Sequence, residues 1–124
     1  TACSTAVGAT TVGLDHSWVG DVVLKLTSPG GTTVTLIDQA GGALNSGNNF
    51  CQTVLDDSGA SSIQTVTSAD APFTGTFRPA NPLSGFSGET GDGTWVVNVS
   101  DNASFDTGSL RAFTLELAGF TCAP

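Results

Sequence analysis

The sequence predicts an all-β protein built as an antiparallel β-sandwich. Apolar and polar residues alternate at every second position in several short runs, as expected of strands that bury one face. The 124 residues include 16 glycines and many serines and threonines, which suit short strands joined by turns. No amphipathic helical stretch of useful length accompanies them. At this length we expect a single domain over residues 1–124.

The first third of the chain contains a clear hairpin. Residues 1–13 are small and weakly patterned, and residues 15–21 form a polar turn around Trp18. Strict alternation in residues 22–27 predicts a strand. Proline and glycine in residues 28–31 then predict a tight turn into a second strand, because proline fixes φ and glycine permits positive φ. The inward positions of the two strands are Val22, Leu24, Leu26, Val34 and Leu36.

The middle of the chain has shorter and weaker strand signals, separated by segments rich in Gly, Ser and Asn. Pro79 and Pro82 are expected to stop an edge strand, because proline cannot donate a hydrogen bond to a ladder. The expected strands cover residues 50–55 and 74–77, with a short extended piece at 63–66 and loops at 40–49, 58–71 and 83–93.

The C-terminal stretch, residues 91–117, predicts a hairpin with one face in the core. Two alternating strands flank an acidic loop. We expect Trp95 to anchor the core beside Phe113 and Leu24. The inward positions of this hairpin are Trp95, Val97, Val99, Phe113, Leu115 and Leu117.

The charge balance is strongly acidic. Eleven acidic residues face three basic ones, Lys25, Arg78 and Arg111, for a formal charge of −8. Such a surface repels nucleic acid and anionic membranes, because phosphate binding needs clustered Lys and Arg, and it suits divalent cations or an extracellular protein. No apolar run approaches the ~20 residues that a membrane helix needs. With no signal peptide, the chain is expected to be a mature, secreted, monomeric fragment of a longer precursor.

The chain has three cysteines, which allow three single-bridge pairings. Terminal strands that are neighbours in a sandwich would bring Cys3 and Cys122 together, and we expect this bridge. Cys51 would then be a buried free thiol. A bridge from Cys51 to Cys122 is the alternative. CxxC spacing is absent, which argues against a structural zinc site.

The single histidine, His16, stands between Asp15 and Ser17. A Ser-His-Asp triad needs partners that converge in space, whereas neighbours on a strand end point to opposite faces. No GxSxG elbow is present. We therefore interpret His16 as a turn residue bonded to the backbone, and expect no catalytic residues in this chain.

Adjacent carboxylates occur at Asp56 and Asp57, at the end of an expected strand. Being adjacent, they diverge and do not flank one substrate bond as a glycosidase pair must. Two interpretations remain open. Aspartate readily caps a turn by binding the backbone two residues on, and it is also a ligand of hard cations such as Ca²⁺.

Topology suggests an acidic rim formed by Asp21, Asp101 and Asp106. If the first strand pairs antiparallel with the last, the turn at residues 15–21 and the loop at 101–109 lie at one end, with Asp15 nearby. Three like charges at one end repel unless a cation neutralises them, and Ca²⁺ accepts irregular loops of oxygen ligands. We therefore expect calcium here, a purely hydrogen-bonded rim being the alternative. Folding of the long loops over the same end would add Asp56, Asp57 and Glu89 to the ligands.

Five segments, in order, resemble the P domain, also called P/Homo B. Any one of them is weak, but five in register are specific, and together they span roughly residues 14–117. They are DHSWVGDVVLKLTSPGGTTVTLID (15–38), LDD (55–57), GTFRPANPLSGFSGE (75–89), GTWVVNVSD (93–101) and DTGSLRAFTLEL (106–117).

The resemblance implies a jelly-roll-like sandwich that accompanies a protease. P domains lie C-terminal to the catalytic domain in kexin- and furin-like convertases and in many bacterial secreted proteases. The resemblance thus implies a non-catalytic accessory domain of a secreted subtilisin-like serine protease. Its partner would be the catalytic domain of the same parent chain, which it would stabilise or help to mature, with binding of substrate protein as a further option. Some P domains bind calcium, and His16 falls in an H-x-x-x-G-D turn with no catalytic part.

Two other classes of protein compete with this expectation. A calcium-bearing carbohydrate-binding module is the first alternative, but a sugar platform needs coplanar exposed aromatics. The chain has two Trp, no Tyr, and seven Phe that mostly fall at inward positions. A small hydrolase is the second, and the lone His16 makes it the weaker of the two.

Overall fold

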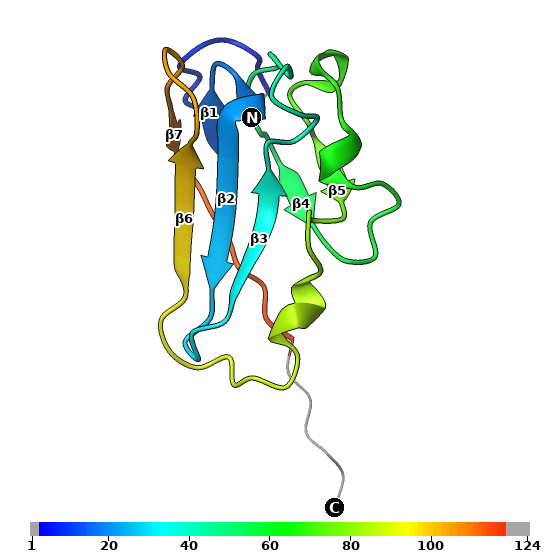
Figure 1. Cartoon of the computed structure of the whole chain (residues 1–124), viewed down its shortest axis with the longest axis vertical. Helices are drawn as coiled ribbons and strands as arrows, with labels where there is room; N and C mark the ends of the chain where they lie inside the picture. Colours follow the sequence, from blue (N-terminus) through cyan, green and yellow to red (C-terminus); the bar gives the residue numbers. More distant parts are fainter. Residues whose placement is uncertain (1–2, 119–124) are drawn as a thin grey trace, which may run out of the picture.

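The computed structural model describes residues 3–118, which form short strands joined by turns (Figure 1). The strands are β1 (Leu14–His16), β2 (Val22–Thr27), β3 (Thr33–Asp38), β4 (Thr53–Leu55), β5 (Gly75–Phe77), β6 (Val96–Asp101) and β7 (Gly108–Leu110). Single 3-10 turns lie at η1 (Val19–Asp21), η2 (Ile63–Thr65), η3 (Ser68–Asp70) and η4 (Leu83–Phe86). No α-helix, and no helix able to cross a membrane, lies within residues 3–118. The all-β prediction is confirmed.

The described strands pair in three small sheets. The largest is antiparallel, with β2 between β3 and β6, and a second antiparallel pair joins β1 to β7. The third sheet pairs β4 with β5 in parallel. Antiparallel pairing thus prevails, as predicted, and it brings the first strand of the chain beside the last.

The core lies on one face of the β3-β2-β6 sheet. The five inward positions predicted for β2 and β3 are all buried, and they pack with Val19, Phe50, Ile63 and Phe73. Ile37 is buried beside Leu36, although strict alternation would turn it outward. The register between β2 and β3 shifts at Leu24 and Lys25, so two residues of β3 oppose one of β2. This bulge turns both side chains toward the core.

The predicted C-terminal hairpin is not formed. β6 pairs with β2, and the residues beyond β7 run on without a strand partner along residues 111–118 (Figure 1). The Arg111 and Ala112 N–H groups both donate to the Gly13 carbonyl, after which the pairing with the first strand ends. Phe113 and Leu117 are consequently 43% and 56% exposed, whereas Leu115 packs on the core.

The face assigned to β6 is confirmed, but the environment of Trp95 is not. Val97 and Val99 pack on the core, while Val96 is 51% exposed. Trp95 does pack on the core, as predicted, but its neighbour is Phe86, with ring centroids 5.1 Å apart, whereas Leu24 lies opposite Val99 in the register. The Trp95 indole N–H donates to the Gly91 carbonyl at 3.0 Å, which fixes the ring near the end of the sheet.

Two further elements differ from the sequence expectation. Residues 63–65 form η2 rather than an extended piece, and the Ser62 hydroxyl caps this turn by accepting from the Gln64 N–H at 3.1 Å. The strand predicted at 50–55 begins only at Thr53, because Gln52 adopts a positive φ of 52°. The edge strand predicted at 74–77 is confirmed as β5.

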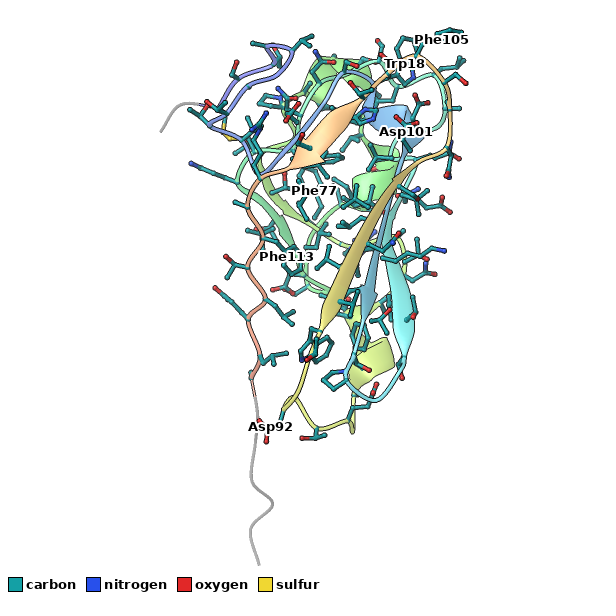
Figure 2. All side chains as sticks on the ribbon, turned by 90° about the vertical axis from the view of Figure 1, so that its left-hand side faces the viewer. Trp18, Phe77, Asp92, Asp101, Phe105 and Phe113 are labelled. Atoms are coloured by element: carbon teal, nitrogen blue, oxygen red, sulfur yellow. A yellow bond between two sulfur atoms is a disulfide. The ribbon has the colours of Figure 1, made fainter. Side chains whose placement is uncertain are left out.

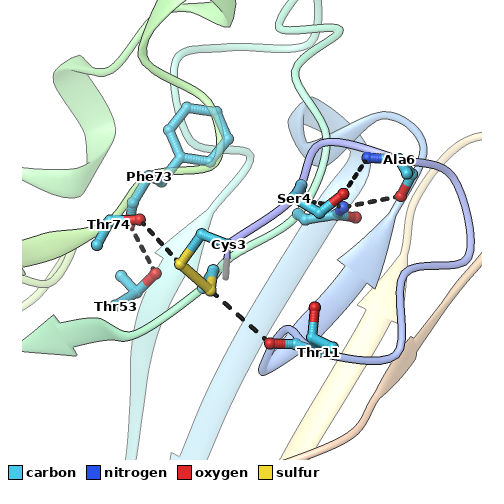
Figure 3. The surroundings of a disulfide bond; sticks show 9 residues. Cys3, Ser4, Ala6, Thr11, Thr53, Phe73 and Thr74 are labelled. Atoms are coloured by element: carbon cyan, nitrogen blue, oxygen red, sulfur yellow. Dashed lines mark hydrogen bonds between the residues drawn. A yellow bond between two sulfur atoms is a disulfide. The ribbon is translucent and has the colours of Figure 1, made fainter. Parts of the chain in front are cut away.

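A disulfide joins Cys3 to Cys51 (Figure 3). The expected Cys3–Cys122 bridge, the free thiol expected at Cys51 and the alternative Cys51–Cys122 bridge are therefore wrong. Cys122 lies outside the described residues. The N-terminal segment packs against the chain around Phe50, where the Asn49 side chain donates to the carbonyls of Ser4 and Ala6. The neighbour of the N-terminus in space is therefore mid-chain, which places Cys51 within reach.

We predict that Cys3→Ser lowers the free energy of unfolding by about 4 kcal/mol, the chain-entropy value for a loop of this length. The bridge spans 48 residues. Cys51→Ser should have a comparable effect, and Cys122→Ser, as the control, should leave the denaturant midpoint near that of the wild type. A larger loss in Cys122→Ser than in Cys3→Ser would contradict this pairing.

Candidate functional site

The acidic rim consists of Asp21, Asp101 and Asp106. Asp101 lies at one end of the domain (Figure 2), and the charges of Asp101 and Asp106 are close enough to act on Asp21. Pairing of β2 with β6 places Val22 opposite Asp101, and the Asn102 N–H donates to the Asp21 carbonyl at 2.9 Å. Antiparallel pairing of β1 with β7 brings the turn after His16 beside the loop that leads into Gly108. The structure therefore brings together the turn and the loop that were expected to meet.

His16 is buried beneath this rim and held by hydrogen bonds at both ring nitrogens. Its Nδ1 accepts from the Trp18 N–H at 3.0 Å, so this nitrogen carries no proton. Nε2 is then the protonated nitrogen, and it donates to Asp101 Oδ2 at 2.7 Å. A histidine engaged on both sides has no free nitrogen for a nucleophile, in agreement with the structural interpretation.

The sequence neighbours of His16 serve different partners. The Ser17 hydroxyl donates to Asp106 Oδ1 at 2.8 Å, and Asp15 Oδ2 accepts from Arg111 Nε at 2.7 Å. This ion pair links β1, which contains Asp15, to the segment that follows β7, and Asp15 itself is buried. Ser17 and Asp15 therefore do not complete a triad with His16, and both act as ties between the two ends of the chain.

Hydrogen bonds occupy much of the rim. Asp101 uses both carboxylate oxygens, since Oδ1 accepts from the Ala103 N–H at 2.8 Å and Oδ2 accepts from His16. Asp106 uses Oδ1 for Ser17. Within residues 3–118, no group of three or more His, Cys, Asp or Glu is arranged to hold a metal ion.

Asp21 is the exception at the rim, because its carboxylate accepts no hydrogen bond from any residue between 3 and 118. It is only 5% exposed. Burial raises the pKa of Asp21, and the nearby charges of Asp101 and Asp106 raise it further, against a smaller lowering by His16. No buried side-chain oxygen of residues 3–118 lacks a hydrogen-bond partner, so the carboxylate of Asp21 reaches solvent at the rim although the residue as a whole is nearly buried.

The other expected ligands are not brought to the rim. Asp56 Oδ1 accepts from the N–H and hydroxyl of Ser58, and these bonds lower the pKa of Asp56. Asp57 accepts from the N–H groups of Leu83 and Ser84 at the start of η4. Both aspartates therefore accept hydrogen bonds from backbone N–H groups at turns, as the turn-capping interpretation predicted.

Glu89 lies at the opposite end of β2 from the rim. Its Oε1 accepts from the hydroxyl of Ser28, the residue that follows β2, whereas Asp21 precedes that strand. The expectation that long loops would bring Glu89 to Asp21 is wrong, because the 83–93 link closes over the β2–β3 turn instead.

A pocket of about 580 Å³ opens beside the rim. Leu14, Val97, Val99 and Leu110 form apolar walls, while His16, Asp101 and Asp106 contribute polar groups. The walls come from β1, β6 and β7, strands of two different sheets. Sequence alone missed this pocket, since alternation assigns a side chain to a face but does not say which strands enclose a space.

Comparison with known proteins decides the family. Residues 7–117 match the family described as "Proprotein convertase P-domain". The chain belongs to this family. The resemblance inferred from the five sequence segments is therefore confirmed.

This P-domain also resembles two curated proteins. Each is named "Calcium-dependent protease", one from Trichormus variabilis and one from a Nostoc species, and each is 31% identical over 111 residues. The match covers 86% of this chain but only 13% of each relative, so the P-domain spans a small part of their length. No solved structure matches the chain significantly.

We predict that Asp21→Asn stabilises the P-domain at neutral pH when chelator is present. Because the folded pKa of Asp21 is raised, the folded state holds its proton more tightly than the unfolded state does. Stability contributed by this group is therefore present below the unfolded pKa of about 3.9 and is lost as pH rises through the folded pKa. The variant lacks this loss, so its advantage should grow with pH.

Urea midpoints measured from about pH 3 to pH 8 test this dependence. Asp92→Asn is the matched control, because it removes one charge from an exposed site. If both variants gained the same stability, the effect would come from net charge alone, and the raised pKa of Asp21 would not be its cause.

Proposed function

We propose that this P-domain is a non-catalytic accessory domain of a secreted subtilisin-like serine protease. In that role it packs on the catalytic domain of the same parent chain and stabilises it or aids its maturation. The observation that carries the proposal is the P-domain match over residues 7–117. The names of the two relatives support it, since in each a protease chain contains a region like this one.

The bonding of His16 supports a role without catalysis. General base catalysis needs a nitrogen within reach of a nucleophile. Both ring nitrogens of His16 are engaged, with the Trp18 N–H and Asp101, and Ser17 is bonded to Asp106. The residues that would form a triad by composition instead hold the two ends of the chain together.

A tethered domain can stabilise its neighbour by linkage. A partner that binds the folded state alone shifts the unfolding equilibrium in favour of that state. A covalent tether raises the effective concentration of the partner to roughly the millimolar range, so even a weak interface is occupied. We further propose that the three sheets belong to one jelly-roll-like sandwich, as in the resemblance, and that the domain is extracellular. The Cys3–Cys51 bridge supports the extracellular proposal.

We predict that removing this P-domain from its parent protease shortens the half-life of activity at elevated temperature. The expected reason is loss of the linkage between the two folded domains. The test compares the full-length parent with a version that ends before the P-domain, and also assays the isolated P-domain on peptide, ester and glycoside substrates. An unchanged half-life and yield of mature enzyme would contradict the accessory role. Turnover by the isolated domain that disappears in His16→Ala would contradict it as well.

We also propose that the acidic rim binds Ca²⁺ through Asp21, Asp101 and Asp106. Asp21 supports the fit, because its carboxylate accepts no hydrogen bond from the described residues, and because partial burial and then its acidic neighbours raise its pKa. A hard cation with oxygen ligands would neutralise this charge. Calcium would compete with the hydrogen bonds that His16 and Ser17 make to the rim. The word "calcium-dependent" in the names of the relatives supports the choice of ion.

We predict that calcium raises the melting temperature of this P-domain and that chelator lowers it. Binding to the folded state alone contributes about 2.7 kcal/mol at a hundredfold excess over Kd, which corresponds to several degrees. Asp106→Asn should blunt the response, because it removes a charge that the ion needs, while Asp92→Asn should retain it. A wild-type curve indifferent to calcium, with no ion retained by elemental analysis, would exclude the site.

A further inference from the structure

We propose that the pocket beside the acidic rim binds a lysine or arginine side chain presented by a protein segment. The pocket measures about 580 Å³ and is bounded by β1, β6, β7 and the loop between the last two. This volume lies within the range of small-molecule and side-chain sites. The proposal adds a partner chemistry to the P-domain and does not depend on calcium.

The walls of the pocket suit the stem of a basic side chain. Lys and Arg lay an aliphatic stem along apolar surface while the charged head stays near polar groups. Leu14, Val97 and Val99 supply such a surface, and Asp101 and Asp106 lie in the lining of the same pocket. An apolar wall with carboxylates is the complement of a long cationic side chain.

No cation of the described residues neutralises these carboxylates. Arg111 is bonded to Asp15, and Arg78 donates to the carbonyls of Gly59 and Ala60. Lys25 is exposed in the middle of β2, opposite Asn98. Among the described residues that line the pocket, His16 is the one base, and both of its ring nitrogens are already engaged, with Asp101 and with the Trp18 N–H.

Asp21 lies outside the pocket lining, but it adds a third negative charge at this end of the domain. It is 5% exposed and accepts no hydrogen bond from residues 3–118, yet Asp101 and Asp106 lie close enough to act on it. A cationic head held by Asp101 and Asp106 would offset this repulsion.

Phe105 presents an aromatic ring in the loop that borders the pocket. Its side chain is fully exposed, and its two near neighbours in the chain, Ala103 and Asp106, line the pocket. Its φ of 81° is unusual for a residue other than glycine, and such backbone outliers concentrate at functional sites. A ring in this position can cover a cationic side chain through a cation–π contact.

A polypeptide fits this end better than a free amine does. Figure 2 shows Trp18, Phe105 and Asp101 at one end of the molecule, and Leu44, next to the carbonyl that Trp18 binds, is 89% exposed. Exposed apolar side chains at the same end would let a bound protein segment bury surface beyond the one basic side chain. The net charge of −8 would also attract a basic segment and exclude anionic partners.

The test is titration of the domain with a blocked peptide that carries a single arginine between two leucines, in chelator and at low ionic strength. The matched peptide carries citrulline, which keeps the shape of the side chain and removes its charge. We expect at least tenfold weaker binding of the citrulline peptide. Phe105→Ala and Asp106→Asn should each weaken binding of the arginine peptide several-fold, while Asp92→Asn should not. Amide chemical shifts should change at Val99, Asp101 and Asp106.

Equal binding of the two peptides would overturn the proposal, as would equal weakening by Asp92→Asn and Asp106→Asn, which would leave only attraction by net charge. The melting curve of each variant shows whether weaker binding is merely a result of unfolding. Phe105 is fully exposed, so Phe105→Ala should leave the melting curve unchanged. Absence of peptide binding together with a calcium-dependent melting temperature would overturn this proposal and leave the calcium proposal standing. A change in the stability of the parent protease bears on the accessory role alone.

Discussion

The pairing of β2 with β6 is the constraint on which the other features depend. Its register sets Leu24 against Val99 and Val22 against Asp101, so one ladder aligns the core and the acidic rim together. A slip by one residue would turn every side chain of β6 to the other face. Core packing therefore fixes the rim: burying Val97 and Val99 leaves Asp101 at the end of the strand, beside the turn that carries Asp21.

Alternation in the sequence assigned the inward positions of β2 and β6 correctly, but it did not identify the partner of each strand. Val22, Leu24 and Leu26 lie in the core as predicted, because a period of two has one solution once a face is buried. The same period in residues 112–117 predicted a strand that the structure does not form. Alternation does not determine the partner: β6 pairs with β2 on one edge, and its other edge has no strand partner among the described residues. The Cys3–Cys51 bridge was missed for a related reason, since cysteine spacing does not reveal connectivity.

The rim could be predicted because it needs only strand direction. Antiparallel neighbours place the end of one strand beside the start of the next, so Asp21, Asp101 and Asp106 follow from topology. The hydrogen bonds from His16 to Asp101 and from Ser17 to Asp106 could not be predicted, as they depend on side-chain rotamers and on the loop path. Asp57 and Glu89 were misplaced because long loops carry no periodic signal of where they fold.

The rim combines a fixed geometry with three neighbouring negative charges, and this combination is the physical basis of both binding proposals. Hydrogen bonds from His16 and Ser17 hold Asp101 and Asp106 in place, so the carboxylates cannot separate to relieve their repulsion of Asp21. The cost of that repulsion is a loss of folding stability at neutral pH. A cation that bound only the folded state would restore part of this stability, and the gain would increase with the ratio of cation concentration to Kd. A domain arranged in this way is more stable when its cationic partner is bound, which is a physical route by which an accessory domain can respond to its surroundings.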